Sequence, residues 1–142
     1  MKVKVQQVNQ GFQLSSSNGS EEILIGVSQE YQKDTKGLRP MELLLSGLGA
    51  CLSIDILNLT KKMRLDLNGL KVSVNGERDA EPPKAFNAIN IEISCNGVIK
   101  EEKIVLVIKK VVDQHCSVIH SLNPTIKLNV YVLVNDKKIN CI

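Results

Sequence analysis

The stretch Pro40–Met63, PMELLLSGLGACLSIDILNLTKKM, decides the fold of this chain. Its pattern predicts one helix, because Pro40 suits a first helical position, where its missing N–H costs no hydrogen bond. Glu42 lies in the first turn, and Lys61 and Lys62 lie in the last, so the charges match the helix dipole at both ends. Such a helix is a rod of about 36 Å, which is long for a small domain.

Apolar side chains cover most of the circumference of this predicted helix. They recur at steps of three and four residues: Leu44, Leu48, Cys51, Leu52, Leu59 and Met63, with Leu45 and Ile56 widening the stripe. A chain this small can bury such a helix only with a sheet wrapped round it or with a second subunit. Three small residues precede the cysteine: Gly47, Gly49 and Ala50. Another backbone can approach the helix closely there. Such packing would offset the loss of helix stability, about 1 kcal/mol for each glycine.

The composition is that of one soluble globular domain over residues 1–142, with 43% hydrophobic and 23% charged residues. Aromatic residues make up 3%, and the net charge of +3 is spread without a basic block, which disfavours nucleic-acid binding. The four cysteines follow neither a zinc pattern nor a disulfide framework, so we expect no metal site. Cys95 and Cys141 lie in no motif and are interpreted as incidental.

The start of the chain argues against export. Met1-Lys2-Val3-Lys4-Val5 alternates as a strand does and lacks the apolar run of a signal peptide. The leucine run 43–45 is too short and too interrupted to span a membrane. We therefore expect a cytoplasmic protein with free thiols and no membrane partner.

Strand patterns flank the helix on both sides. Before it, the predicted features are strands at Val3–Val5, Gly11–Leu14 and Ile23–Ile25, a turn at 17–20 and a polar loop at 30–38. After it, they are a turn at Asn68–Gly69, an alternating strand from Leu70 to Val74, a long strand from Phe86 to Cys95 and a turn at Asn96–Gly97.

Residues 101–114 are ambiguous, because the run from Ile104 to Ile108 is rich in β-branched residues and would also suit a strand. Glu101 and Glu102 before this run and lysines after it favour a helix, as do the apolar residues that share one face. A short helix over 116–122 and a period-two strand over 126–134 complete the chain. The order is βββ-α-ββ-α-β, an α+β domain with an antiparallel sheet.

The run Arg39-Pro40-Met41-Glu42-Leu43-Leu44-Leu45, followed by Gly49-Ala50-Cys51, resembles the OsmC/Ohr family of thiol peroxidases that reduce organic hydroperoxides. Cys116 occupies the place after the penultimate helix where that family carries its partner thiol. The element order matches as well, so the resemblance spans essentially the whole chain. A helix-borne cysteine after this motif, with a second cysteine 65 residues later, is a specific combination.

The resemblance implies an intertwined homodimer, in which two central helices pack side by side and the sheets of both subunits wrap around them. It also implies a site at the subunit interface, where the Cys51 thiolate attacks the peroxide and becomes a sulfenic acid. Cys116 then condenses with Cys51 to a disulfide, which an external dithiol reduces. In well-studied members of the family that dithiol is a lipoyl group, and no cofactor is expected.

The chain departs from the peroxidase pattern at three places. The glutamate that follows the helix-starting proline in those enzymes is Met41 here, and Glu42 lies about 180° round the helix from Cys51. The N-terminal hairpin has no arginine, and Arg39 is the nearest in sequence. Cys116 is followed by serine where proline is common. In the less understood branch of the family an aspartate follows the cysteine by four residues, as Asp55 follows Cys51 here. In this respect the sequence resembles that branch.

Several interpretations stay open for these residues. Cys51 suits either a reactive thiol or a small buried hydrophobe, and Asp55 either holds a substrate group or partner-subunit cation or forms a structural pair, because an acidic neighbour disfavours a thiolate. His115 either activates Cys116 or is a cap or surface residue. Leu48, Leu52 and Met41 are expected to line an apolar substrate pocket.

Three functions follow from these alternatives: a thiol peroxidase, a non-catalytic dimer that binds a small apolar molecule, and a structural dimer with inert cysteines. The peroxidase interpretation predicts that Cys51 and Cys116 lie close enough to bond, with Cα atoms within about 7 Å. It also predicts that the helix start at Cys116 lowers the pKa of that thiol.

Overall fold

The computed structural model describes residues 1–139, so Cys141 lies outside the described residues. The elements are β1 (Lys4–Gln7), β2 (Leu14–Ser17), β3 (Glu22–Ile25), α1 (Pro40–Lys62), β4 (Asp66–Arg78), β5 (Phe86–Val98), α2 (Glu101–Lys110), the π-helical turn η1 (Val111–His115), α3 (Ser117–Ser121), β6 (Lys127–Val134) and β7 (Lys137–Ile139). The predicted α+β class and element order are confirmed, with β7 and η1 as additions. The chain forms two compact units that divide between Leu44 and Leu45, and the single domain over 1–142 stays a prediction.

The N-terminal unit is an antiparallel sheet in the order β1-β2-β3. The strand predicted from Gly11 is wrong at its start, because β2 begins at Leu14. The buried Gln13 lies just before this strand and forms side-chain hydrogen bonds instead. The Gln13 side-chain amide donates to the carbonyls of Ile25 at 2.9 Å and Lys36 at 3.0 Å, and its oxygen accepts from the Lys36 N–H at 2.8 Å. This side chain ties the loop before α1 to the sheet.

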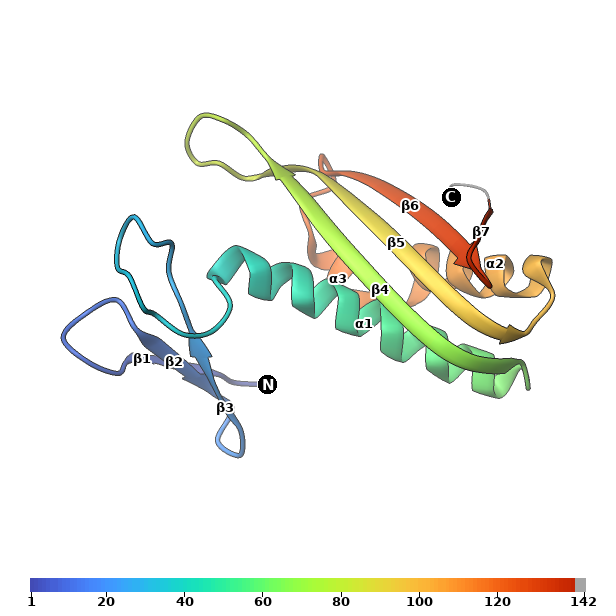
Figure 1. The fold of residues 1–142 in the computed structure, drawn as a ribbon, viewed down its shortest axis with the longest axis horizontal. Helices are drawn as coiled ribbons and strands as arrows, with labels where there is room; N and C mark the ends of the chain where they lie inside the picture. The colour runs from blue at the N-terminus through green and yellow to red at the C-terminus, as the bar shows by residue number, and fades with distance from the viewer. Residues whose placement is uncertain (140–142) are drawn as a thin grey trace. The chain divides into compact units, whose positions relative to one another are not determined.

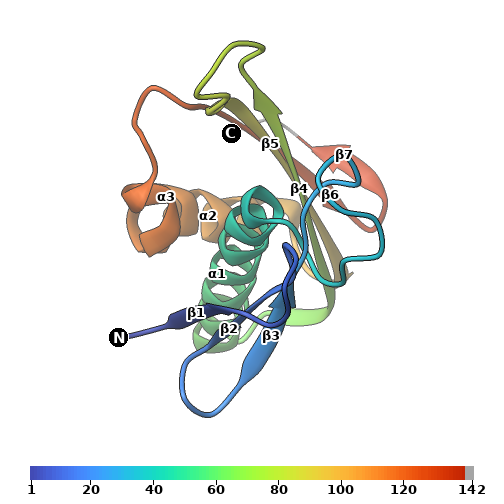
Figure 2. The same cartoon turned by 90° about the vertical axis from the view of Figure 1, so that its left-hand side faces the viewer.

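The C-terminal unit is a four-stranded sheet in the order β4-β5-β6-β7. Figures 1 and 2 show α2, α3 and the part of α1 in this unit on one face of the sheet. The alternating residues of β5 and β6 point into the core between these layers, as the period of two requires. The buried set includes Ile89, Ile91, Ile93, Val130, Val132, Ile104, Val107 and Ile108.

The prediction of a wholly antiparallel sheet is wrong at one pair of strands. β5 and β6 are parallel, with Ile89 opposite Leu128 and Cys95 opposite Val134. A parallel pair needs a long crossover connection, which α2, η1 and α3 supply here. The pairs β4–β5 and β6–β7 are antiparallel.

Two predicted turns are wrong, because they lie inside long strands. Asn68–Gly69 belongs to β4 and Asn96–Gly97 to β5, where the register shifts between Leu67 and Gly69. Pairing along the whole β4–β5 ladder outweighs the local preference for turns, and the extra residue is accommodated as a β-bulge. The missed β7 follows a two-residue hairpin at Asn135–Asp136, whose φ angles of 48° and 65° suit a tight hairpin turn.

The predicted central helix is confirmed as α1. It ends in a Schellman motif: Arg64 has φ 54°, and the Leu65 N–H donates to the Thr60 carbonyl at 3.0 Å. Gly49 allows the close approach to β4 that the sequence suggested, since a Cβ added there would lie 3.3 Å from a Val74 methyl group. Gly47 faces open space instead.

Only one face of α1 belongs to the core. It comprises Leu48, Leu52, Ile56 and Thr60, at four-residue steps. Ile54 and Leu57 are 66% and 50% exposed, although both are large and apolar. The sequence pattern overestimated the buried stripe at Leu59 and Met63, which are only partly buried.

By length and composition alone α1 would pass for a membrane span, with a mean hydropathy of 1.7 over its most apolar window. This is weak support for a membrane role, because the core helix of a soluble domain passes the same criterion. Leu48, Leu52 and Ile56 are buried against the rest of the C-terminal unit, as in such a core helix.

Candidate active site

Cys51 lies in the middle of α1 and is half-buried. Asp55 follows it by one helical turn, so the two side chains share a face of the helix. The Cys51 thiol donates to the Asp55 carboxylate, with 3.8 Å between Sγ and Oδ2. The structure therefore pairs the candidate nucleophile with an acidic group on the same helix.

Cys116 is delivered by an irregular stretch of backbone. Its N–H donates to the Val111 carbonyl at 2.9 Å, five residues back, which closes the π-helical turn η1. Such turns inside helices occur frequently at functional sites. The chain then becomes extended at Cys116, with φ −69° and ψ 97°, and α3 starts at the next residue. This turn places the fully buried Cys116 at the N-terminus of α3.

The two thiols are neighbours within the C-terminal unit. Burial raises the pKa of the Cys116 thiol from 9.0 to about 11, and hydrogen bonding and charge interaction with Cys51 add to the shift. The amide of Ile119 acts in the opposite direction, although no regular capping hydrogen bond forms. The predicted lowering of this pKa by the helix start is thus wrong, because α3 is one short turn and burial outweighs it.

Cys95 offers a contrast to Cys116. It is fully buried in β5, and burial raises the pKa of its thiol to about 11 as well. Its neighbours in register are Leu70 on β4 and Val134 on β6. Cys51, Cys95 and Cys116 are all free thiols.

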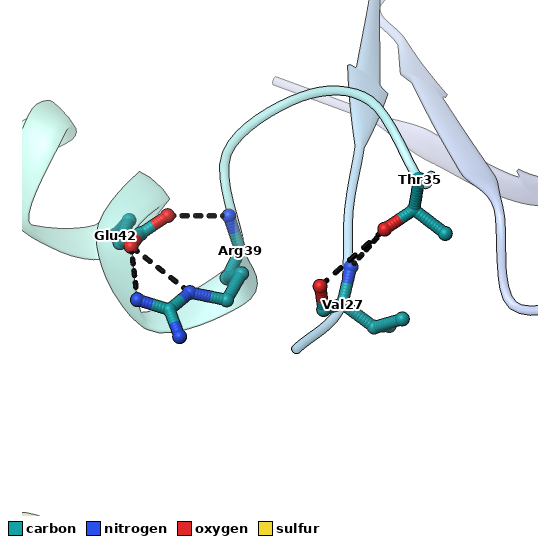
Figure 3. A network of polar contacts seen from close by, with 4 residues as sticks. All are labelled: Val27, Thr35, Arg39 and Glu42. Carbon is teal, nitrogen blue, oxygen red and sulfur yellow. Dashed lines mark hydrogen bonds and ion pairs between the residues drawn. The ribbon is translucent and has the colours of Figure 1, made fainter. Parts of the chain in front are cut away.

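Arg39 and Glu42 form a separate polar cluster at the start of α1 (Figure 3). The Glu42 carboxylate accepts from the Arg39 backbone N–H and from its Nε, both at 2.9 Å, and also pairs with Nη2. Glu42 thereby closes the helix N-terminus as in a capping box. The hydrogen bonds from Arg39 lower the pKa of Glu42, and those to Glu42 raise the pKa of Arg39. Next to this pair, in the same unit, Thr35 is hydrogen-bonded to the Val27 backbone.

The remaining candidate residues differ in their exposure to solvent. His115 is exposed at the end of η1. Leu48 is 1% exposed and Leu52 is fully buried, so the expectation that they line an open substrate pocket is wrong and both belong to the core. Within residues 1–139 no group of three or more His, Cys, Asp and Glu side chains is arranged to hold a metal ion.

The fold and the thiol pair define a class of protein: an α+β domain with a helix-borne cysteine and a second, buried cysteine beside it. A family model described as OsmC-like protein matches residues 33–130, which is most of the chain. The chain belongs to the OsmC-like protein family.

The chain is also similar to particular relatives. It is 26% identical to Protein YhfA of Escherichia coli over 114 residues, which cover 80% of this chain and 81% of YhfA. Among solved structures, it is similar to a hypothetical protein from Aquifex aeolicus, with a TM-score of 0.83, 27% identity and coverage of 94% and 95% of the two chains. An organic hydroperoxide resistance protein, OsmC, from Legionella pneumophila has a TM-score of 0.68 and 14% identity over 94% and 96% of the chains, which shows a shared fold.

Proposed function

We propose that this protein is a thiol-dependent peroxidase-like enzyme that reduces organic hydroperoxides through Cys51 and a Cys51–Cys116 disulfide. One observation carries the proposal: the thiols of Cys51 and Cys116, which come from separate elements 65 residues apart, are neighbours close enough to interact. Cys51 is half-buried on a rigid helix, while Cys116 is buried at the junction of η1 and α3. The name of the Legionella protein, which shares the fold, supports the same chemistry.

In the proposed reaction, the Cys51 thiolate attacks one peroxide oxygen, the O–O bond breaks, and an alcohol leaves with a proton. Cys51 is oxidised to a sulfenic acid. The Cys116 sulfur then attacks the Cys51 sulfur, the S–O bond breaks, and water leaves with the Cys116 proton. A dithiol reductant, such as a lipoyl group, restores both thiols by exchange and is itself oxidised to a disulfide.

The proposal includes a homodimer in the cytoplasm. Its support is the apolar side of α1 that the C-terminal unit leaves uncovered, with Ile54 at 66% and Leu57 at 50% exposure. A second copy of α1 would bury this side. In such a dimer the units 1–44 and 45–142 would together make one domain of the OsmC-like family.

One observation favours a second candidate function, a non-catalytic dimer that binds a small apolar molecule. The Cys51 thiol donates to Asp55, and this hydrogen bond exists only while the thiol keeps its proton. Peroxide attack needs the thiolate, so a Cys51 that serves only as the donor to Asp55 would bind a ligand without catalysis.

Turnover of cumene hydroperoxide with dithiothreitol separates the two functions. The wild-type protein should turn over, with a preference for the organic hydroperoxide over hydrogen peroxide, and Cys51→Ser should be inactive. Cys116→Ser should complete one turnover and leave a Cys51 sulfenic acid that dimedone traps. Cys95→Ala is the matched control, because it also removes a buried thiol but should keep the activity. Turnover by Cys51→Ser, or none by the wild-type protein, would reject the enzyme and favour the binding function.

A further inference from the structure

Asp55 is the only charged residue on α1 between Glu42 and Lys61. Its neighbours one turn away on the helix are Cys51, Leu52, Asn58 and Leu59, none of which carries a charge. The ion pairs found within residues 1–139 are Arg39–Glu42 and Lys137–Glu101, and Asp55 belongs to neither. Within residues 1–139 of one chain, a half-buried carboxylate therefore stands beside the candidate nucleophile and takes part in none of these ion pairs.

From this arrangement we propose that Asp55 determines the charge specificity of the site: Cys51 reacts preferentially with small molecules that carry a positive charge. The inference rests on the proposed function for its peroxide substrate. It extends that function by naming the chemical class of the substrate: an organic hydroperoxide whose apolar body carries a cationic group. Asp55 would bind the cation while the reactive atom meets Cys51.

Two effects of a cation act in the same direction. Without one, formation of the Cys51 thiolate would put a second negative charge close to the Asp55 oxygen, which accepts from Sγ at 3.8 Å. Like charges at that distance repel each other. A ligand cation paired with Asp55 removes this repulsion, and it also concentrates the ligand at the thiol.

The helix geometry sets the size of the ligand. Side chains four residues apart on a helix have Cβ atoms about 6 Å apart. The cation and the reactive atom should therefore be separated by a short linker of a few bonds. Neutral and anionic reactants lack the pairing, and anionic ones are in addition repelled by Asp55.

Three methanethiosulfonates of similar size test the inference without any peroxide: the cationic aminoethyl, the neutral ethyl and the anionic sulfonatoethyl reagents. The Cys51 thiolate attacks the sulfenyl sulfur of each, a new S–S bond forms, and methanesulfinate leaves while the thiol proton passes to solvent. Rates at Cys51 are read by peptide mass mapping and normalised to those of 2-mercaptoethanol with the same reagents.

The wild-type protein should react about tenfold faster with the cationic than with the neutral reagent, and slowest with the anionic one. Asp55→Asn should reduce the cationic preference to less than about twofold, and Asp55→Glu should keep much of it. Asp66→Asn, at the start of β4, is the control and should keep the full preference. A purely structural role of Asp55 would change all three rates together.

Equal normalised rates for the three reagents in the wild-type protein, absence of Cys51 modification, or an undiminished preference in Asp55→Asn would each overturn the inference. Its failure can be distinguished from that of the peroxidase function, because these reagents report on Cys51 and Asp55 whether or not hydroperoxides are reduced. If the protein turns over hydroperoxides but shows no charge preference, only the role of Asp55 is lost.

Discussion

The start and the middle of α1 each carry a carboxylate, and the two carboxylates have opposite kinds of neighbours. At the start, the exposed Arg39 neutralises Glu42 and the pair closes the helix end. In the middle, the half-buried Asp55 has a thiol as its hydrogen-bond partner, and the residues around it on the helix are uncharged. A carboxylate in an ion pair stabilises the fold, whereas a half-buried carboxylate that forms no ion pair within residues 1–139, beside the candidate nucleophile, is a cost that the proposed function would explain.

The two places also differ in packing. Leu44, near the start, is 41% exposed, while Leu52, next to Cys51, is fully buried. Substitutions at the middle should therefore affect the stability of the chain far more than those at the start. Three predictions test this difference, from the largest effect to the smallest.

The largest effect is expected for Leu52→Ala, which should lower the free energy of unfolding by about 2–5 kcal/mol, because it leaves a cavity in the core. Leu44→Ala, the matched change near the start, should cost below about 1 kcal/mol. Urea unfolding of both variants measures the difference. Similar losses in the two would contradict the assignment of the core face of α1.

The second prediction concerns pH: Glu42, at the start of α1, and Cys116, the thiol beside Cys51, should lose their contributions to stability on opposite sides of neutrality. The pKa of Glu42 is lowered in the folded chain, so its contribution is present above its ordinary value of 4.5 and is lost as the pH falls through the folded value. The pKa of Cys116 is raised from 9.0 to about 11, so its contribution is present below 9.0 and is lost as the pH rises toward 11.

Unfolding measured across pH checks both signs. Glu42→Gln should flatten the acid side of the stability profile, and Cys116→Ala should flatten the alkaline side. Cys95 has a similarly raised pKa and contributes to the same alkaline loss, so the Cys116 effect is best read in a Cys95→Ala background. An alkaline profile that does not change on removal of Cys116 would argue against its burial.

The smallest effect is a difference of sign at neutral pH. Glu42→Gln should destabilise the chain modestly, because it removes the ion pair with Arg39 and weakens the helix cap. Asp55→Asn should leave stability unchanged or raise it, because it removes a half-buried charge that forms no ion pair within residues 1–139. Thermal unfolding of the two variants side by side is the measurement. Destabilisation by Asp55→Asn as large as that by Glu42→Gln would mean that Asp55 has a structural partner.

Local patterns in the sequence predicted α1 and most of the strands, because these depend on spacing and on end residues such as Pro40 and Glu42. They did not predict the parallel pairing of β5 and β6, which depends on where the α2–α3 crossover returns the chain. Asn68–Gly69 and Asn96–Gly97 are strong turn signals, yet the long ladder between β4 and β5 includes both. Local propensity is weaker there than the pairing of two 13-residue strands.

The candidate site was predicted unevenly. The residues Cys51 and Cys116 came from the family resemblance, whereas the i, i+4 spacing of Cys51 and Asp55 predicted their contact directly. The apolar stripe predicted the burial of Leu48, but it could not distinguish the fully buried Leu48 from Leu59 and Met63, because apolar side chains cover most of the helix. The raised pKa of Cys116 results from burial, which is a property of the complete fold, and the π-helical turn that delivers this residue has no sequence signature that we recognise.

The measurement that tests the central claim most directly is disulfide mapping after one equivalent of cumene hydroperoxide is added to the fully reduced protein. We predict one crosslink per chain, between the peptides of Cys51 and Cys116, with a mass decrease equal to two hydrogen atoms and with Cys95 still reducible and unmodified. Oxidation of Cys51 to sulfinic acid without a crosslink, or a disulfide that joins either thiol to Cys95 instead, would contradict the account.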